Sequence, residues 1–414
     1  MVSSDRTRFL QTSLWAGLWV VASVLAATMF LAANASGQTF QVLHSFSGGG
    51  DGGSPSAGLT MDRAGNLYGT TQFGGAGLEG TVFKLSRAGS GRVLSTLYGF
   101  RGSSDGGYPE GRVVFGPDGG LYGTTSVGGE GYGTVFEIRP PATVCHAVSC
   151  PWTETVLYRF QAGSDGAGPQ YVDLSFDRFG NIYGTTLAGG LSTCEGGTCG
   201  VVFQLTPADG SWTESVLYRF TGGADGYAPQ SGVILDGSGN IYGTTFEGGG
   251  AGKGTAYELS SSASGWTETT LTDLSGASGG DPIGGLTFDS HGNLFGTGYF
   301  NGPVFELQPS GGTWSFTQIA VLNGFDGPTG SLTFDSSGNL FGSSLIGGAN
   351  GDGFVFKLTP SAGGWTVTDL YDFQGLEDGA NPMGNVILDS NGNLYGTTVL
   401  GGAHGSGVVW EITP

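Results

Sequence analysis

The 414-residue sequence is poor in charged side chains, and basic residues are the scarcest of them. It has 14 Lys and Arg against 34 Asp and Glu, which gives a formal net charge of −20. Charged residues make up 12% of the chain, about half of the ~25% found in an ordinary soluble domain. A chain of this charge repels nucleic-acid phosphates and anionic membranes. We therefore expect neither as a partner, and we expect a monomer.

Cysteine and histidine are equally scarce, with four of each. No two histidines stand at the spacing of metal ligands. The cysteines form two close pairs, Cys145 with Cys150 and Cys194 with Cys199. A C-x4-C metal site would require both pairs to converge, whereas two local disulfides would not. We expect a local disulfide within each pair, because the fold predicted from the internal repeat places the two pairs in loops on opposite faces.

Long apolar runs are absent except near the N-terminus, where Leu14 to Ala33 follows Arg6 and Arg8. Ala33-Asn34-Ala35 then offers a small-residue cleavage site. This order of segments predicts a signal peptide over residues 1–35. Because the run is long, an uncleaved N-terminal anchor is the alternative. Either way we expect an exported protein that is secreted, periplasmic or on the cell surface.

Glycine is abundant instead, with 84 residues, and it belongs to an internal repeat. The segment GNLYGTT returns seven times, at steps of 46 to 61 residues. The aromatic residue at its centre is Tyr68, Tyr122, Tyr183, Tyr242, Phe295, Phe341 and Tyr395. Each unit holds four strand-like runs, which we call a to d: GLTMD (58–62), the GNLYGTT run, TVFKL (81–85) and TVLYRF (155–160) and their relatives.

Four short antiparallel strands in a unit of about 50 residues are typical of a propeller blade. We therefore predict an all-β fold, a seven-bladed β-propeller over residues 40–414. The chain begins with an unmatched d strand, FQVLHSF (40–46), and ends on a c strand, VVWEITP (408–414). Pairing these two would complete the last blade and cover its open edge.

The order of GNLYGTT, a Gly-Gly loop and a GTVFKL strand resembles the GloVer tandem repeat of choice-of-anchor exported bacterial proteins. The resemblance covers residues 40–414 and all seven units. It implies an exported bacterial surface protein and implies no reaction. A C-terminal sorting anchor occurs in many members, and the end at Glu411-Ile412-Thr413-Pro414 does not match one.

Two glycine-rich matches to nucleotide-binding loops do not fit this fold. Gly75, Gly77 and Gly80 have the G-x-G-x-x-G spacing, and GGGAGKGT (248–255) approaches a P-loop. Both chemistries need a helix directly after the loop. Here a strand follows each, so we interpret these glycines as b–c connections between strands.

An Asp-containing loop, mostly D-G-x-x-P, joins each unit to the next. Its carboxylates are Asp51, Asp105, Asp165, Asp225, Asp281, Asp326 and Asp378. Because strand a is innermost in a propeller, these d–a loops reach the mouth of the central channel. Seven carboxylates there could hold Ca²⁺. The alternative is turn chemistry, in which each Asp accepts backbone N–H groups, and we favour it because the residue recurs in every unit. No other cofactor is indicated.

Function is expected where the units differ, which is mainly in the b–c loops. The candidate ligand-binding residues there are Glu79, Glu130, Tyr132, Glu247, Tyr299, Asp352 and His404. They share one face with the d–a carboxylates, so we predict a strongly acidic face. We favour a non-catalytic binding or scaffold protein whose partner is a polysaccharide, a cation or a surface protein. The alternative is a glycan hydrolase or lyase that uses carboxylates from different blades, although we assign no catalytic residue.

Overall fold

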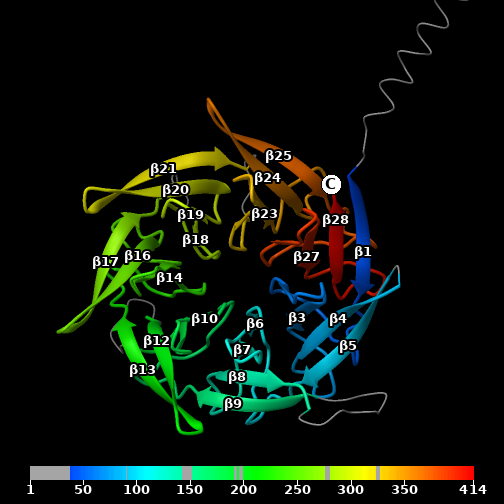
Figure 1. Cartoon of the computed structure of the whole chain (residues 1–414), viewed down its shortest axis with the longest axis horizontal. Coiled ribbons are helices and arrows are strands. Elements are labelled where there is room, and N and C mark those ends of the chain that lie inside the picture. Colours follow the sequence, from blue (N-terminus) through cyan, green and yellow to red (C-terminus); the bar gives the residue numbers. More distant parts are fainter. Residues whose placement is uncertain are drawn as a thin grey trace, which may run out of the picture. The chain divides into compact units, whose positions relative to one another are not determined.

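The computed structural model describes residues 38–89, 91–141, 152–190, 194, 199–275, 280–322 and 327–414. Residues 40–411 form one compact unit, a ring of seven antiparallel sheets around a central axis (Figure 1). Among the described residues the regular elements are all strands, and no helix there is long and apolar enough to span a bilayer. The predicted signal peptide lies outside the described residues.

Each sheet is one blade with strands a to d in order from the axis outward. Blade 1 comprises β2 (Thr60–Met61), β3 (Leu67–Thr71), β4 (Thr81–Ala88) and β5 (Gly91–Gly99). Blade 2 comprises β6 (Val114–Phe115), β7 (Leu121–Thr125), β8 (Thr134–Arg139) and β9 (Thr153–Arg159). Blade 3 comprises β10 (Ser175–Phe176), β11 (Ile182–Thr186), β12 (Val201–Ala208) and β13 (Ser211–Arg219). Blade 4 comprises β14 (Ile234–Leu235), β15 (Ile241–Thr245), β16 (Thr255–Ser262) and β17 (Gly265–Asp273). Blade 5 comprises β18 (Thr287–Phe288), β19 (Leu294–Thr297), β20 (Pro303–Ser310) and β21 (Thr313–Val321). Blade 6 comprises β22 (Thr333–Phe334), β23 (Leu340–Ser344), β24 (Phe354–Ser361) and β25 (Gly364–Asp372). Blade 7 comprises β26 (Ile387–Leu388), β27 (Leu394–Thr398), β28 (Val408–Thr413) and β1 (Thr39–Ser45).

The ring closes as the sequence predicts, because β1 is the outer strand of blade 7. The sheet order there is β1-β28-β27-β26, and Figure 1 shows β1 beside β28. The Phe46 N–H donates to the Gly407 carbonyl at 3.0 Å. The Phe40 ring stacks on Tyr371 of blade 6, with ring centroids 3.9 Å apart. The N-terminal strand thus completes the last blade and also contacts the blade before it.

The innermost strands are shorter than the predicted GLTMD run, with only two residues in every blade. Glycine and proline precede each of them, and a turn that begins with Asp follows in six of the seven blades. The neighbouring blade supplies further hydrogen bonds: the Thr287 hydroxyl donates to the Leu332 carbonyl at 2.7 Å, and the Thr333 hydroxyl to the Val386 carbonyl at 2.6 Å. The inner strands are therefore hydrogen-bonded to the neighbouring blade as well as within their own sheet.

The repeated glycine of GNLYGTT has a packing role inside each blade. A Cβ atom built on Gly69 would lie 2.6 Å from the Phe83 ring of strand c, and the same is true of Gly184 and Phe203. All seven blades repeat this close approach of an aromatic ring to the glycine backbone. Since real Cβ contacts are longer, only glycine lets the ring lie flat across strand b.

Aromatic contacts join neighbouring blades. The Tyr68 ring of blade 1 lies 5.3 Å from Phe115 and 6.4 Å from Trp152, both of blade 2. Trp212, Trp314 and Trp365 meet the preceding blade in the same way, and Trp266 packs in the cluster that contains Tyr183. The recurrent tryptophans are therefore packing residues between blades.

The turn between strands a and b is built by an Asp and an Asn. In blade 1, Asp62 accepts hydrogen bonds from the backbone of Ala64 and Asn66, the Asn66 amide and the Tyr68 hydroxyl. Burial alone would raise the pKa of Asp62, but these hydrogen bonds outweigh it and lower the pKa. This contact set explains why the sequence D-x-x-G-N recurs between strands a and b in six of the seven blades.

Candidate ligand-binding face

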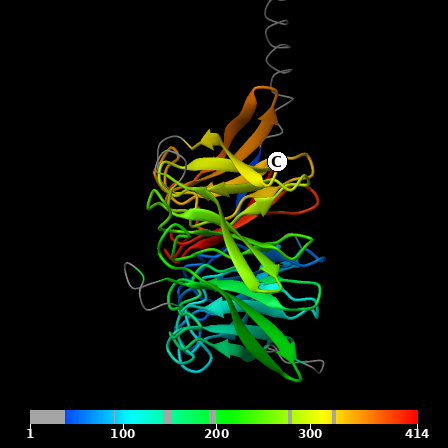
Figure 2. The same ribbon diagram turned by 90° about the vertical axis from the view of Figure 1, so that its left-hand side faces the viewer.

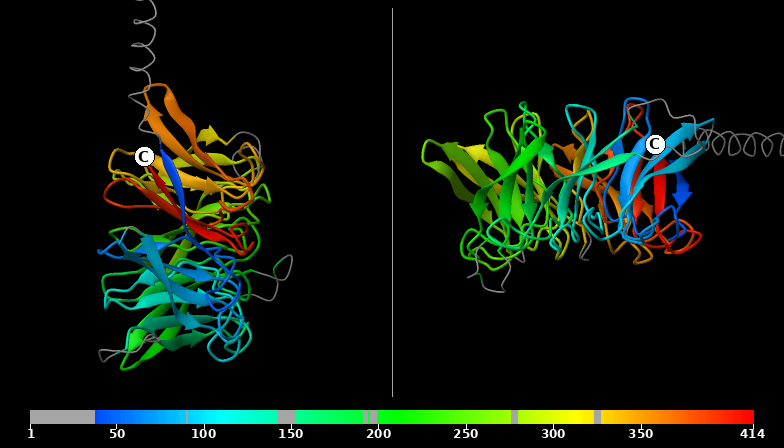
Figure 3. Two further views of the ribbon diagram at one scale, coloured as in Figure 1. Left: turned by 90° about the vertical axis from the view of Figure 1, so that its right-hand side faces the viewer. Right: turned by 90° about the horizontal axis from the view of Figure 1, so that it is seen from below.

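Seen edge-on, the strands of the ring run between two faces on which the connections gather (Figure 2, Figure 3). The b–c and d–a loops share one face. In blade 2, Gly107 of the d–a loop pairs with Val127 of the b–c loop, and four other blades contain the equivalent bridge. We call this the bc/da face. All seven predicted ligand-binding residues lie on it.

The turn carboxylates of this face are engaged within their own loops. Asp105 accepts from the Tyr98 hydroxyl at 3.0 Å and the Arg101 N–H at 3.1 Å. Asp51, Asp165, Asp225 and Asp378 repeat the pattern, with His44 replacing the tyrosine at Asp51. These contacts support the turn interpretation.

Asp281 does not occupy the turn position. It directly precedes Pro282, has a φ of 58° and pairs with the Lys253 ammonium at 2.9 Å. Asp326 lies outside the described residues. Within the described ranges, no group of three or more His, Cys, Asp or Glu side chains is placed to hold a metal ion, so the calcium ring stays a prediction.

A second ring of variable residues precedes the proline of each d–a loop, and the sequence analysis missed it. Its members are Ser54, Tyr108, Gly168, Ala228, Asp281, Gly327 and Asn381, all with positive φ. Their N–H groups donate, at 2.7 to 3.0 Å, to the carbonyls of Ser406, Glu79, Tyr132, Cys199, Lys253, Tyr299 and Asp352 of the preceding blade's b–c loop. Each blade-to-blade junction therefore joins two variable residues through the same backbone hydrogen bond.

At the blade 1–2 junction the two side chains are Glu79 and Tyr108. The Glu79 charge, and to a smaller extent burial, raise the pKa of the Tyr108 hydroxyl. The Tyr108 ring meets Phe73 edge to face at 5.4 Å, and Phe73 is 45% exposed. Leu78, next to Glu79 in the loop, is 69% exposed. This junction therefore combines apolar surface with a carboxylate.

Aromatic side chains also accompany charged groups in blades 4 and 5. The Tyr227 hydroxyl donates to the Glu247 carboxylate. The Lys253 ammonium lies 5.0 Å from the centre of the Phe300 ring, and Tyr299 meets Phe300 edge to face at 5.2 Å. Glu247 and Tyr299 are thus held beside ring systems, each at its own blade.

The other four predicted residues lie at separate loops. Tyr132 is 45% exposed beside Gly168, and Glu130 is exposed in the same loop. Asp352 lies against Gly375, where an added Cβ would be 2.6 Å from its carboxylate. His404 is exposed. The contacts of the seven residues run to neighbouring loops rather than to one another, so the face contains several small sites.

The axis of the ring narrows to a cavity of about 50 Å³ lined by the segments that lead into the inner strands. It contains the Arg112–Asp173 ion pair, at 3.0 Å, and Tyr171, a one-residue insertion with a φ of 56°. Glu110 is buried there. The Gln72 amide donates to its Oε1, whereas Oε2 has no hydrogen-bond partner among the described residues. Burial raises the pKa of Glu110.

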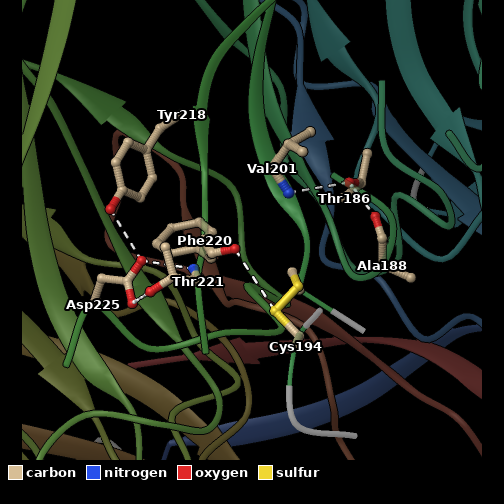
Figure 4. Close-up of a disulfide and its surroundings, with 9 residues drawn as sticks. Thr186, Ala188, Cys194, Val201, Tyr218, Phe220, Thr221 and Asp225 are labelled. Carbon is tan, nitrogen blue, oxygen red and sulfur yellow. Dashed lines mark hydrogen bonds between the residues drawn. A yellow bond between two sulfur atoms is a disulfide. The ribbon is translucent and has the colours of Figure 1, made fainter. Parts of the chain in front are cut away.

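One predicted disulfide is present, between Cys194 and Cys199 in the b–c loop of blade 3 (Figure 4). The Cys199 carbonyl accepts the junction hydrogen bond from Ala228. The disulfide thus takes the place of a variable side chain at the blade 3–4 junction. Cys145 and Cys150 lie outside the described residues.

Solved structures resemble this ring in fold. Virginiamycin B lyase from Staphylococcus aureus superposes with a TM-score of 0.56 at 14% identity, over 91% of this chain and 99% of that one. The extracellular domain of the one-component system BT4673 from B. thetaiotaomicron superposes with a TM-score of 0.53 at 12% identity, over 89% of this chain and 39% of that one. At these identities the likeness shows the propeller fold alone.

Sequence comparison identifies the family of the chain through a family model. No curated protein matches it. The family model of the Gloeobacter/Verrucomicrobia repeat matches residues 27–198, 150–303 and 297–414, which together cover nearly the whole chain. The chain belongs to the Gloeobacter/Verrucomicrobia repeat family, and the seven blades are its repeats.

Proposed function

We propose that this protein is an exported, non-catalytic propeller that binds a neutral polysaccharide on its bc/da face. One observation carries the proposal: nine large apolar side chains are exposed among the described residues, and six of them lie on this face. The six are Phe73, Leu78, Tyr132, Phe300, Leu376 and Leu400. These side chains lie in the loops of several blades, and we take their excess on one face as the mark of an interaction surface.

The polar groups beside these rings suit a sugar. A pyranose presents an apolar C–H face and a rim of hydroxyl groups, so it needs a ring to stack on and acceptors close by. Glu79 and Glu247 supply carboxylates next to Tyr108 and Tyr227. The net charge of −20 opposes an anionic polymer.

Three observations support export: the signal-peptide pattern of residues 1–35, the disulfide Cys194–Cys199, and membership of the Gloeobacter/Verrucomicrobia repeat family. A disulfide persists in oxidising compartments outside the cytosol, and Cys194–Cys199 is formed. Polysaccharides of other cells or of the cell's own envelope are available there. Secretion and cell-surface display both fit this proposal.

The test is a thermal-shift screen of the purified protein against neutral glucans, xylans and mannans, with polygalacturonate as the anionic comparison. A ligand that binds only the native state raises the melting temperature with concentration. We expect a shift with at least one neutral polymer and none with the anionic one. If no neutral polymer shifts the transition, the proposed function is refuted.

The channel favours a second candidate, an enzyme that acts on a glycan. A buried carboxyl with a raised pKa in a cavity is a common feature of catalytic sites, and Glu110 has both properties, with Asp173 as a second carboxyl from the next blade. The cavity of about 50 Å³ is, however, far below the ~300 Å³ of ordinary ligand pockets. Release of reducing or unsaturated ends that is abolished in Glu110→Gln would favour this candidate over binding.

A further inference from the structure

We propose that the blade 1–2 junction, formed by Phe73, Leu78, Glu79 and Tyr108, is the principal subsite for one neutral pyranose unit. This inference rests on the proposed function and deepens it, because it names one junction of the seven. It is argued from backbone conformation, from side-chain geometry and from charge.

The backbone gives the first argument. Four b–c loops have the same length: GGAGLEG (74–80), GGGAGKG (248–254), GGANGDG (347–353) and GGAHGSG (401–407). Their fifth residue has positive φ in every case, and it is Gly252, Gly351 or Gly405 in three loops but Leu78, with a φ of 65°, in the first. A leucine is strained where its relatives have glycine.

Tyr108 on the facing loop also has a left-handed backbone conformation, with a φ of 53°. The equivalent residues of the other junctions are smaller, and they are Ser54, Gly168, Ala228, Asp281, Gly327 and Asn381. The junction hydrogen bond uses only backbone atoms, so the fold does not require a tyrosine there. Two bulky residues in left-handed conformations therefore meet at one junction. Strain of this kind is a mark of functional sites.

The side chains of the junction are arranged as a ring platform with an acceptor at its edge. Phe73 and Tyr108 meet at 5.4 Å with an angle of 65° between the ring planes. The Glu79 side chain lies across Gly102 and Gly107, where an added Cβ would approach it to 2.8 and 3.0 Å. The glycines therefore leave the space in which this carboxylate sits beside the Tyr108 hydroxyl.

Local charge favours a neutral occupant over a basic peptide. The exposed Arg101 belongs to the same d–a loop, and its backbone packs against Gly77 of the b–c loop. The two loops then carry two acids, Glu79 and Asp105, and one base, and the Asp105 carboxylate is already engaged by the Tyr98 hydroxyl and the Arg101 N–H. A neutral sugar can use the Glu79 carboxylate as a hydroxyl acceptor without requiring a net negative site.

The decisive experiment replaces each of the two residues by glycine, which adopts the left-handed conformation without strain, as Tyr108→Gly and Leu78→Gly. We expect both variants to bind the polymer found in the wild-type screen at least about tenfold more weakly, while their melting temperatures stay level or rise by about 1–2 °C. A residue with a merely structural role would lower the melting temperature on removal. Ala228→Gly relieves the same backbone conformation at the blade 3–4 junction and should leave binding unchanged.

Three outcomes would overturn the inference. Unchanged binding by Tyr108→Gly, with the wild type still bound, would move the subsite elsewhere and leave the proposed function intact. Equal losses in Tyr108→Gly and Ala228→Gly would show a general loop effect rather than a site. Binding of oligolysine, but of no neutral polymer, at this junction would refute the ligand class and the proposed function together.

Discussion

Replacing two glutamates of the outer strands should change how stability depends on pH. Glu154 and Glu214 lie opposite Ile138 and Leu205 of strand c. Blades 1, 5 and 6 have Leu, Phe and Val at this position of strand d, and blade 4 has a third glutamate, Glu268. The Oε1 atom of each glutamate is buried without a hydrogen-bond partner among the described residues. These are carboxyls in an apolar position, where the neutral form is preferred.

Burial, with a smaller effect of the neighbouring Asp105 or Asp165, raises the pKa of both glutamates from 4.5 to about 7. The native state therefore holds more protons than the unfolded chain between these values, and its stability falls as pH rises from about 4.5 to 7. The difference corresponds to about 3.4 kcal/mol per residue at ~1.36 kcal/mol per pKa unit. Both side chains are partly exposed, so screening by solvent reduces this to about 1–2 kcal/mol each.

The double variant Glu154→Gln/Glu214→Gln keeps the shape of both side chains and removes the charge. We expect it to be more stable than the wild type by about 2–4 kcal/mol at pH 8 and equal to it near pH 4.5. Urea unfolding of both proteins at half-unit pH steps measures the difference. Glu130→Gln, in an exposed loop, should give no pH-dependent change. A constant difference between wild type and double variant at all pH values would refute the reasoning.

Three further predictions test the fold. Gly69→Ala places a Cβ 2.6 Å from the strand-c ring, and should destabilise by about 1–3 kcal/mol in urea, whereas Gly237→Ala, with nothing within 4 Å, should stay within ~0.5 kcal/mol. Replacing Cys194 and Cys199 by serine opens a loop with a sequence separation of 5 and should lower stability by about 2 kcal/mol; an unchanged unfolding midpoint would contradict this. Deleting residues 38–45 exposes the edge of blade 7, and we expect aggregation or a lost cooperative melt by size-exclusion and thermal scans; a monomer with the wild-type transition would contradict ring closure as a source of stability.

The repeat made the fold predictable because its residues make the same local contacts in successive blades. Gly69 leaves room for the Phe83 ring, Asp62 accepts the hydrogen bonds of the a–b turn, and Tyr68 packs on Phe115 of the next blade. The offset of one strand at the two ends then left a single way to complete the last blade. The length of the inner strands was predicted less well, because it depends on hydrogen bonds to the neighbouring blade, such as Thr287 to Leu332, that no local pattern records.

The candidate site was predicted only in part for a related reason. The sixth residue of a b–c loop, such as Glu79, stands out as variable in the sequence. Its partner Tyr108 precedes a proline and looks like an ordinary turn residue until its backbone conformation and its hydrogen bond to Glu79 are known. The same holds for Glu110, which the channel buries through the approach of seven chain segments.

The junctions also suggest how one repeat carries different surfaces. Their shared contact joins a backbone N–H to a backbone carbonyl, so it constrains conformation but not side-chain identity. Glycine satisfies the left-handed positions without strain, and it is the residue found at Gly168, Gly252 and Gly405. A bulky residue there opposes the preference of the backbone. Leu78 and Tyr108 are the bulkiest residues at their positions, and they are therefore better guides to ligand binding than the acidic residues that recur in every blade.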